Sequence, residues 1–127
     1  MSTLIQPLSN ISTYLHDTVR TPGTYVHPND LTEHDVIEII NTSNTVQTFN
    51  FYADVSAIIR NNFKLRVYLK IDNSTYQLHN TYTFSATDNV AQFEEAHTSF
   101  SIKVTAQSST AEGATRNIPY IYYLEPN

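Results

Sequence analysis

Side chains that could bind a metal ion or move a proton gather between residues 27 and 35. This stretch contains His27, Asp30, Glu33, His34 and Asp35, whose imidazole nitrogens and carboxylate oxygens are ligands for zinc and other divalent ions. Their spacing matches none of the standard zinc motifs. The alternative is a polar loop in which the Asp30 carboxylate caps a turn before a strand. The spacing favours the loop, and metal binding by His27, Asp30, His34 and Asp35 stays open.

No catalytic motif accompanies these residues. We expect most of the five histidines to be turn or surface residues; they are His16, His27, His34, His79 and His97. Gly23 and Gly113 are the only glycines, too few for a phosphate-binding loop or a Gly-x-Ser-x-Gly nucleophile elbow. The chain also lacks cysteine, which excludes thiol nucleophiles, zinc–thiolate sites and disulfides. The sequence therefore predicts a protein that is not an enzyme and that has no catalytic residue, metal or cofactor.

The carboxylates outside this stretch do not form an acid–base pair either. Glu94 and Glu95 are adjacent, so in a strand their side chains would point to opposite faces. We expect Glu112 to be a loop charge and Glu125 a terminal charge. Hydrolysis by paired carboxylates therefore has little support in the sequence.

The elements that would position these side chains are strands, because apolar and polar residues alternate along the chain. From residue 63 to residue 71 every odd position is apolar, and the even positions carry lysine, arginine or tyrosine. This period of two is typical of a strand. Asp72, Asn73 and Ser74 suit a turn, and residues 76–78 then complete a β-hairpin. Two further strands are expected at 99–107, with Phe100, Ile102, Val104 and Ala106 facing inward, and at 118–125.

The remaining segments are less regular. Residues 36–40 and 46–52 are rich in β-branched and aromatic side chains, which predicts a second antiparallel pair. Residues 54–59 suit a short helical crossover capped by Asp54. Thr21-Pro22-Gly23 suits a type II turn, and Gly113 is expected to adopt a positive φ.

A chain of 127 residues indicates one domain. The pattern predicts an all-β fold, an antiparallel β-sandwich of jelly-roll or immunoglobulin-like type over residues 21–127. Residues 1–20 are expected to form an N-terminal arm or a short helix. Leu4, Leu8, Ile11 and Leu15 are spaced by four, three and four residues, as on an amphipathic helix, although a proline at position 7 limits its length. An arm that orders against a neighbouring subunit is the alternative.

Charge argues against nucleic acid as a partner. The net charge is −5 and the seven basic residues do not cluster. Lys64, Arg66 and Lys70 alternate with Tyr68 along one strand, a pattern typical of a solvated strand face and not of a phosphate-binding stripe. No secretory signal is visible and no segment approaches the roughly 18 apolar residues of a membrane span. The sequence therefore predicts a soluble protein that binds neither nucleic acid nor a membrane.

Tyrosine is the most over-represented residue, with nine copies and no tryptophan. Tyr120 and Tyr122 share the inward face of the last predicted strand, whereas Tyr123 points outward. Aromatic side chains with a polar tip are frequent at interfaces and on sugar-binding surfaces. We therefore expect contacts with partners through the apolar N-terminal residues and two tyrosines: Leu4, Leu8, Ile11, Leu15, Tyr68 and Tyr123.

Three motifs resemble a known group of proteins. Asp54-Val-Ser-Ala-Ile58 and Lys64-Leu-Arg-Val-Tyr-Leu-Lys-Ile-Asp72 with Tyr76 resemble small virion proteins of tailed phages. Ala111-Glu-Gly-Ala-Thr-Arg-Asn-Ile-Pro-Tyr120 resembles the C-terminal hairpin of the same group. The resemblance implies a β-sandwich displayed on a capsid or tail, as in head-decoration or head-fibre proteins, and supplies no catalytic residues.

Two functions follow as expectations. The first is a viral structural protein, located in the virion, that decorates the capsid or forms a minor component. It would act by associating with itself and docking on a major capsid or tail protein. The alternative is a carbohydrate- or receptor-binding module that contacts a glycan through exposed tyrosines.

Overall fold

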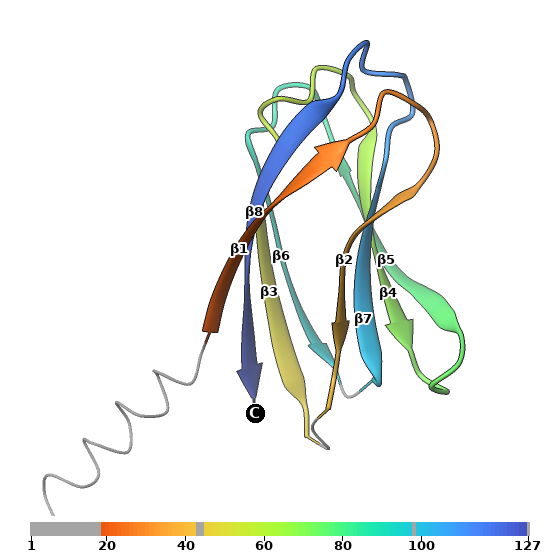
Figure 1. Cartoon of the computed structure of the whole chain (residues 1–127), viewed down its shortest axis with the longest axis vertical. Helices are drawn as coiled ribbons and strands as arrows, with labels where there is room; N and C mark the ends of the chain where they lie inside the picture. The colour runs from red at the N-terminus through yellow and green to blue at the C-terminus, as the bar shows by residue number, and fades with distance from the viewer. Residues whose placement is uncertain (1–18, 43–44, 98, 127) are drawn as a thin grey trace, which may run out of the picture.

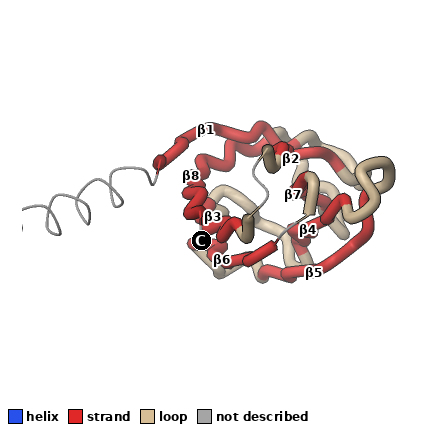
Figure 2. Tube along the Cα trace, turned by 90° about the horizontal axis from the view of Figure 1, so that it is seen from below, coloured by secondary structure: helices blue, strands red, loops and turns tan. Residues whose placement is uncertain are grey.

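The computed structural model describes residues 19–42, 45–97 and 99–126, which form an all-β, antiparallel sandwich of two four-stranded sheets (Figures 1 and 2). None of these residues forms a helix, and none belongs to a helix that could cross a membrane. The eight strands are β1 Val19–His27, β2 His34–Ile40, β3 Gln47–Asp54, β4 Phe63–Lys70, β5 Tyr76–Phe84, β6 Val90–His97, β7 Ser101–Gln107 and β8 Arg116–Pro126.

The strand order identifies the sandwich as a jelly roll. Sheet A has the order β1-β8-β3-β6 and sheet B the order β2-β7-β4-β5. Only β4 and β5 are neighbours in both sequence and sheet; every other connection crosses from one sheet to the other. Two interleaved four-stranded sheets of this kind define the jelly roll. Of the two sandwich types expected from the sequence, the structure selects this one.

The predicted hairpin is confirmed, and the alternation holds over residues 63–68. It fails at Ile71, which follows the end of β4 and is 62% exposed. β4 and β5 pair antiparallel, with one irregularity in register between Val67 and Tyr68. Phe63, Leu65 and Val67 are buried in the space between the sheets. At the hairpin turn Asn73 has a φ of 60°, a conformation that asparagine tolerates better than most residues.

Two other strand predictions need correction. The segments 36–40 and 46–52 are strands, but they do not pair, because β2 lies in sheet B beside β7 and β3 lies in sheet A between β8 and β6. In β7 the expected inward residues Ile102, Val104 and Ala106 are buried, whereas Phe100 is 46% exposed. Phe100 precedes the first residue of β7 and lies at the end of the sandwich, beyond the core.

The predicted turn at residues 21–23 is wrong, because Thr21, Pro22 and Gly23 lie inside β1 and pair with β8. Gly23 faces Tyr120 in the register. A Cβ atom at position 23 would lie 2.4 Å from Cζ and Oη of the Tyr120 ring. The glycine is therefore required for space under an aromatic ring. The other glycine, Gly113, has the expected positive φ of 91°.

The predicted helix at residues 54–59 is also absent, although the crossover is real. The chain passes here from β3 in sheet A to β4 in sheet B through a turn. The Asp54 carboxylate accepts hydrogen bonds from the backbone N–H of Ser56 at 3.0 Å and from its hydroxyl at 2.5 Å. The N–H of Ile58 donates to the carbonyl of Val55 at 3.0 Å. Asp54 thus caps a single turn, with no helix following it.

Aromatic rings join the layers of the core. Phe51 of β3 stacks on Phe93 of β6, with 5.0 Å between ring centroids, and on Tyr120 of β8 at 5.8 Å. Phe93 stacks in turn on Tyr82 of sheet B at 4.6 Å. Tyr120 and Tyr122 pack against the buried core as predicted. The core therefore contains a continuous path of ring contacts from sheet A to sheet B.

The predicted domain boundary is not tested by the structure. β1 begins at Val19, two residues before the predicted start of the sandwich. The N-terminal residues Leu4, Leu8, Ile11 and Leu15, on which the arm or short helix was predicted, lie outside the described residues.

Candidate functional site

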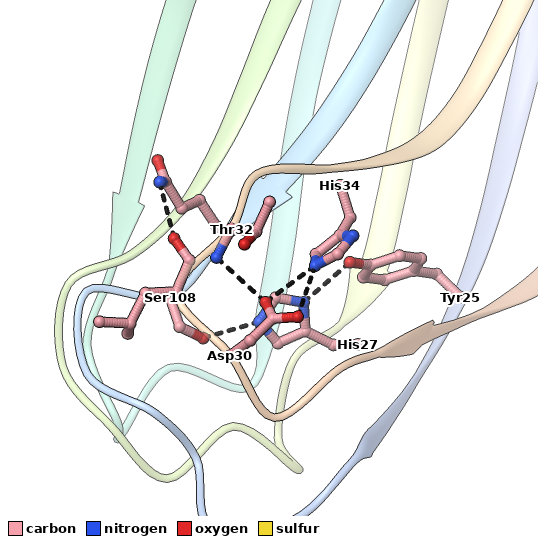
Figure 3. Close-up of polar contacts among 8 residues, drawn as sticks. Tyr25, His27, Asp30, Thr32, His34 and Ser108 are labelled. Atoms are coloured by element: carbon pink, nitrogen blue, oxygen red, sulfur yellow. Dashed lines mark hydrogen bonds and ion pairs between the residues drawn. The ribbon is translucent and has the colours of Figure 1, made fainter.

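The stretch between residues 27 and 35 contributes to two neighbouring polar clusters at one end of the sandwich, with 6.4 Å between the ring centroids of His27 and His34 (Figure 3). His27, at the end of β1, is fully buried. Its Nδ1 lies 2.8 Å from the hydroxyl of Tyr25, and its Nε2 lies 2.7 Å from the hydroxyl of Ser108. His34 instead contacts the Asp30 carboxylate, with its Nε2 at 2.8 and 3.1 Å from the two oxygens.

The arrangement of these side chains bears on the predicted alternative of a metal site. In the part of the chain that the structure describes, no three histidine and acidic side chains converge as metal ligands. Asp30 accepts a hydrogen bond from the N–H of Thr32 at 3.0 Å, so its predicted role in capping a turn is confirmed. Asp35 lies 3.6 Å from the ammonium of Lys103 on sheet B. The loop interpretation therefore fits the described geometry better than a shared metal ion.

The contact between Ser108 and His27 has the geometry of a nucleophile and its base, but it is closed to solvent. Ser108 is 3% exposed and His27 is 0% exposed. The second nitrogen of His27 meets the Tyr25 hydroxyl, where a serine hydrolase has a carboxylate. Buried polar groups normally satisfy one another in this way. The arrangement acts as a structural hydrogen-bond chain that ties β1 to the loop before β8.

Two histidines do not follow the surface expectation. His27 and His97 are buried, with 0% and 6% of their surface exposed. Burial is the main cause that lowers the pKa of both imidazoles, and for His27 the neighbouring His34 lowers it further while Glu112 and Asp30 oppose the shift. Nε2 of His97 has no hydrogen-bond partner among the described residues. Both side chains are therefore kept neutral in the folded protein at pH 7.

We predict that acid destabilises the fold through these two histidines. Below pH 6.5 the imidazoles of His27 and His97 become protonated in the unfolded chain but stay neutral in the folded chain, because burial lowers their pKa. The unfolded state therefore binds more protons, and the free energy of unfolding falls as the pH falls. Each unit of lowered pKa corresponds to about 1.4 kcal/mol. Urea denaturation at pH 7.5 and pH 5.5 measures the loss. His27→Gln, which cannot be protonated in this range, should show a smaller difference between the two pH values; an unchanged difference would contradict the assignment.

Two buried carboxylates were not foreseen. Glu94 is exposed and Glu95 buried, so the prediction that they face opposite ways is confirmed. Glu95 accepts hydrogen bonds from the hydroxyl of Tyr82 at 2.6 Å and from the amide of Asn80 at 3.0 Å, and it lies 3.1 Å from Nε2 of His79. All three partners belong to β5. Glu95 thus connects β6, the edge strand of sheet A, to β5, the edge strand of sheet B.

Glu112 is the second buried carboxylate, and it lies in the loop between β7 and β8, as predicted. Its side chain is inside the protein, with 1% of the residue exposed. It accepts hydrogen bonds from the N–H groups of Ile59 at 2.8 Å and Arg60 at 3.1 Å, and it pairs with the guanidinium of Arg116 at 3.3 Å. Glu112 therefore fastens the loop before β8 to the crossover between β3 and β4.

The outer face of sheet B carries the predicted line of basic residues and Tyr68. Of these basic residues, Arg66 forms an ion pair within the chain, and Lys70 lies over the ring of Tyr76. The hydroxyl of Tyr68 donates to Glu33 at 2.5 Å, and Arg66 lies 3.5 Å from the same carboxylate. The ammonium of Lys103 lies 5.5 Å from the centroid of the Tyr68 ring. This pairing fits the interpretation as a solvated strand face, and a partner for Tyr68 remains a prediction.

The outer face of sheet A carries Tyr123 and Tyr52. Their rings meet edge to face, with 6.2 Å between centroids. Tyr52 is 40% exposed and Tyr123 is partly exposed. This aromatic pair joins β3 and β8, which are adjacent strands far apart in sequence. A partner for Tyr123 remains a prediction as well.

An apolar groove lies beside this pair, at the end of sheet A where β3 ends and β6 begins. Its volume is 470 Å³. The groove is lined mainly by apolar side chains, with polar groups at Asp54, Ser56 and Asn89; the apolar lining includes Tyr52, Val90, Pro119 and Ile121. Sequence analysis missed it because its walls come from three strands whose adjacency appears only in the folded chain. We refer to this surface as the sheet A groove.

Comparison with known proteins adds information on the fold. No protein-family model and no curated protein matches the sequence. Among solved structures, a chain of the acid-stable capsid of Helicobacter pylori bacteriophage KHP30 has a TM-score of 0.51 and 13% identity, with 87% of this chain and 93% of that chain covered. A chain from Bacillus endospore appendages, which are disulfide-linked pili, has a TM-score of 0.50 and 12% identity, with 84% and 85% covered.

A third similarity is to VP2 of infectious bursal disease virus. The TM-score is 0.51 and the identity 10%, and 86% of this chain aligns with 32% of the VP2 chain. This protein therefore spans only about a third of VP2. At these identities the likeness is one of fold: the protein shares its β-sandwich with chains that build viral capsids and a bacterial surface appendage.

Proposed function

We propose that this protein is a structural component of a virion, which associates with itself and docks on a major capsid or tail protein. The observation that carries the proposal is the jelly roll of eight strands, which aligns over most of both chains with the KHP30 capsid chain. The fold alone does not decide function, since jelly rolls also occur in lectins and cupins. Support for assembly therefore has to come from the surface.

Apolar side chains at one end of the sandwich support a contact surface. Ile40 is 60% exposed, Ile71 is 62% exposed and Phe100 is 46% exposed. The N–H of Asn41 bonds to the carbonyl of Phe100, and the N–H of Phe100 bonds to the carbonyl of Lys70, so these segments are neighbours. Figure 1 shows that β1 starts at this same end. Apolar groups gathered on a surface are typical of a protein contact.

The composition favours a virion over a pilus of the endospore type. The similar Bacillus appendages are disulfide-linked, whereas this chain contains no cysteine. Contacts between copies of this chain would therefore have to form without disulfides. The buried position of the Ser108–His27 pair is consistent with a binding role and gives no support to catalysis.

Deleting residues 1–18 tests the proposal. We expect the truncated chain to remain folded, because the described sandwich starts at Val19, and to lose assembly, because the apolar N-terminal residues are removed. Light scattering after size-exclusion chromatography measures the mass, and circular dichroism measures the fold. Leu8→Asp should reproduce the loss, whereas Ser9→Asp, a matched change at a polar position, should not. A truncated chain that assembles like the full chain would show that the segment has no such role.

A carbohydrate-binding role is the second candidate, and the Tyr52–Tyr123 pair favours it. Partly exposed aromatic rings offer the apolar faces on which sugars pack. Glycan-array binding that disappears in Tyr123→Ala but persists in Glu94→Ala would support this candidate. An array with no binding would remove it.

A further inference from the structure

We propose that the sheet A groove receives the N-terminal segment of a second copy, with Leu8, Ile11 and Leu15 as the side chains that enter it. This inference rests on the proposed function, because it names the surface through which the copies associate. The occupant is a segment of this same chain, residues 8–15.

The groove has the exposure and composition of a docking surface. Val90, at the start of β6, is 63% exposed, and Tyr52 of β3 is 40% exposed. Pro119 and Ile121 on the outer face of β8 complete an apolar wall, and Asp54 supplies a polar edge. An apolar centre with a polar rim is the usual composition of a protein interface. A partner that covers these apolar side chains would remove them from water, which would stabilise the complex.

The N-terminal segment has the complementary composition. Residues 1–18 contain no lysine or arginine, and Asp17 is their only acidic residue. Leu8, Ile11 and Leu15 stand at positions i, i+3 and i+7. This is the spacing of the anchors by which an amphipathic helix binds a hydrophobic groove. The polar residues between them, among them Ser9 and Thr13, would face solvent on such a helix.

The topology favours a groove on a second copy over the groove of the same chain. Val19 pairs with Leu124, near the end of β8, whereas Pro119 and Ile121 of the groove lie near its start. Five residues of strand, about 17 Å, separate the levels of Leu124 and Pro119. β1 runs toward the groove, so its first residue, Val19, lies at the opposite end of sheet A. Reaching its own groove would require the chain to reverse direction directly before Val19, whereas a neighbouring copy can be reached without a reversal.

Cysteine cross-linking tests the contact directly, since the natural chain has no cysteine. One protein carries Ile11→Cys and another carries Val90→Cys, and the two are mixed and oxidised mildly. We expect a covalent heterodimer with twice the 14.5 kDa mass of one chain. Thr13→Cys with Val90→Cys controls for the face of the segment, and Ile11→Cys with Glu94→Cys controls for the position along β6. Both control mixtures should give much less of the heterodimer.

Substitution in the groove tests its contribution to assembly. We expect Val90→Asp to raise the protein concentration needed for half-maximal assembly by about tenfold or more, the change that corresponds to a lost contact of about 1.4 kcal/mol. Gln92→Asp is the matched control, because Gln92 is also exposed on the outer face of β6. Both variants should keep the circular dichroism spectrum of the full chain.

The outcomes separate this inference from the proposed function. If the full chain assembles and the 1–18 deletion does not, but Val90→Asp assembles normally and no cross-link forms, the groove is the wrong receptor while the proposed function stands. If a chain carrying both Ile11→Cys and Val90→Cys links only within itself, the segment binds its own groove and the exchange between copies is wrong. If the full chain is monomeric at every concentration, self-association fails in both proposals.

Discussion

Replacing Phe51 by alanine is expected to lower the free energy of unfolding by about 3–5 kcal/mol, the usual cost of removing a buried phenylalanine side chain. Phe51 is 1% exposed. Its ring contacts Phe93 on one side and Tyr120 on the other. The substitution would therefore leave a cavity and interrupt the path of ring contacts through sheet A. A domain of this size has a total stability of roughly 5–15 kcal/mol, so the loss would be a large share of the total.

Urea denaturation of Phe51→Ala beside Tyr52→Ala measures this effect. Tyr52 follows in the same strand and points to the outer face, where it is 40% exposed. Its replacement should cost far less, because water already reaches the ring. Equal losses in the two variants would contradict the assignment of the inner and outer faces of β3.

Replacing Glu112 by alanine is expected to cost a similar amount, about 3–5 kcal/mol, the range measured when one partner of a buried ion pair is removed. The change would leave the N–H groups of Ile59 and Arg60 without their acceptor and Arg116 without its counter-charge. Both loops held by Glu112 would lose their mutual connection. Glu112→Gln keeps one acceptor oxygen and should therefore be less destabilised than Glu112→Ala.

Glu94→Ala is the control for this prediction, because Glu94 is an exposed carboxylate on β6. Its replacement should change the free energy of unfolding by less than about 0.5 kcal/mol, as is usual at the surface. If Glu112→Ala behaves like Glu94→Ala, the carboxylate is not buried in solution. Hydrogen exchange at the amides of Ile59 and Arg60 gives a second measurement, and exchange should be faster in the alanine variant.

The inward and outward faces of the regular strands could be predicted from the sequence. In β4 and β7 apolar and polar residues alternate, and a period of two directs alternate side chains to the core. The hairpin of β4 and β5 was also predictable, because a short turn makes sequence neighbours pair. β1 was not predicted, because proline and glycine at residues 22 and 23 are poor strand formers and interrupt the alternation. The reason for Gly23, its contact with the Tyr120 ring, appears only in the structure.

The partners of the other strands could not be predicted. Alternation states which side of a strand is buried, but not which strand lies beside it. β2 and β3 follow each other in sequence. β2 pairs with β7, whereas β3 pairs with β8 and β6. The prediction that they pair with each other followed the rule that neighbours usually pair, and in a jelly roll that rule fails at every connection except one.

The polar residues show the same limit at the level of single side chains. Asp30 and Asp54 cap turns within their own segments, so local sequence indicated both roles. His27, Glu95 and Glu112 are buried because their partners Ser108, Tyr82 and Ile59 come from distant parts of the chain. A buried charge is tolerated only where such partners satisfy it, and the sequence does not show them.

The sequence by itself determined that this protein is an all-β sandwich, that a hairpin lies at residues 63–78, and which residues of β4, and most of those of β7, face the core. These features depend on contacts between near neighbours and on the two-residue period of a strand. The tertiary structure alone decided the jelly-roll order, the burial of His27 and Glu112, and the groove formed by β3, β6 and β8. Each of these features depends on contacts between side chains that are far apart in the sequence. Such contacts form only when the chain crosses from one sheet to the other, so no local sequence pattern indicates them.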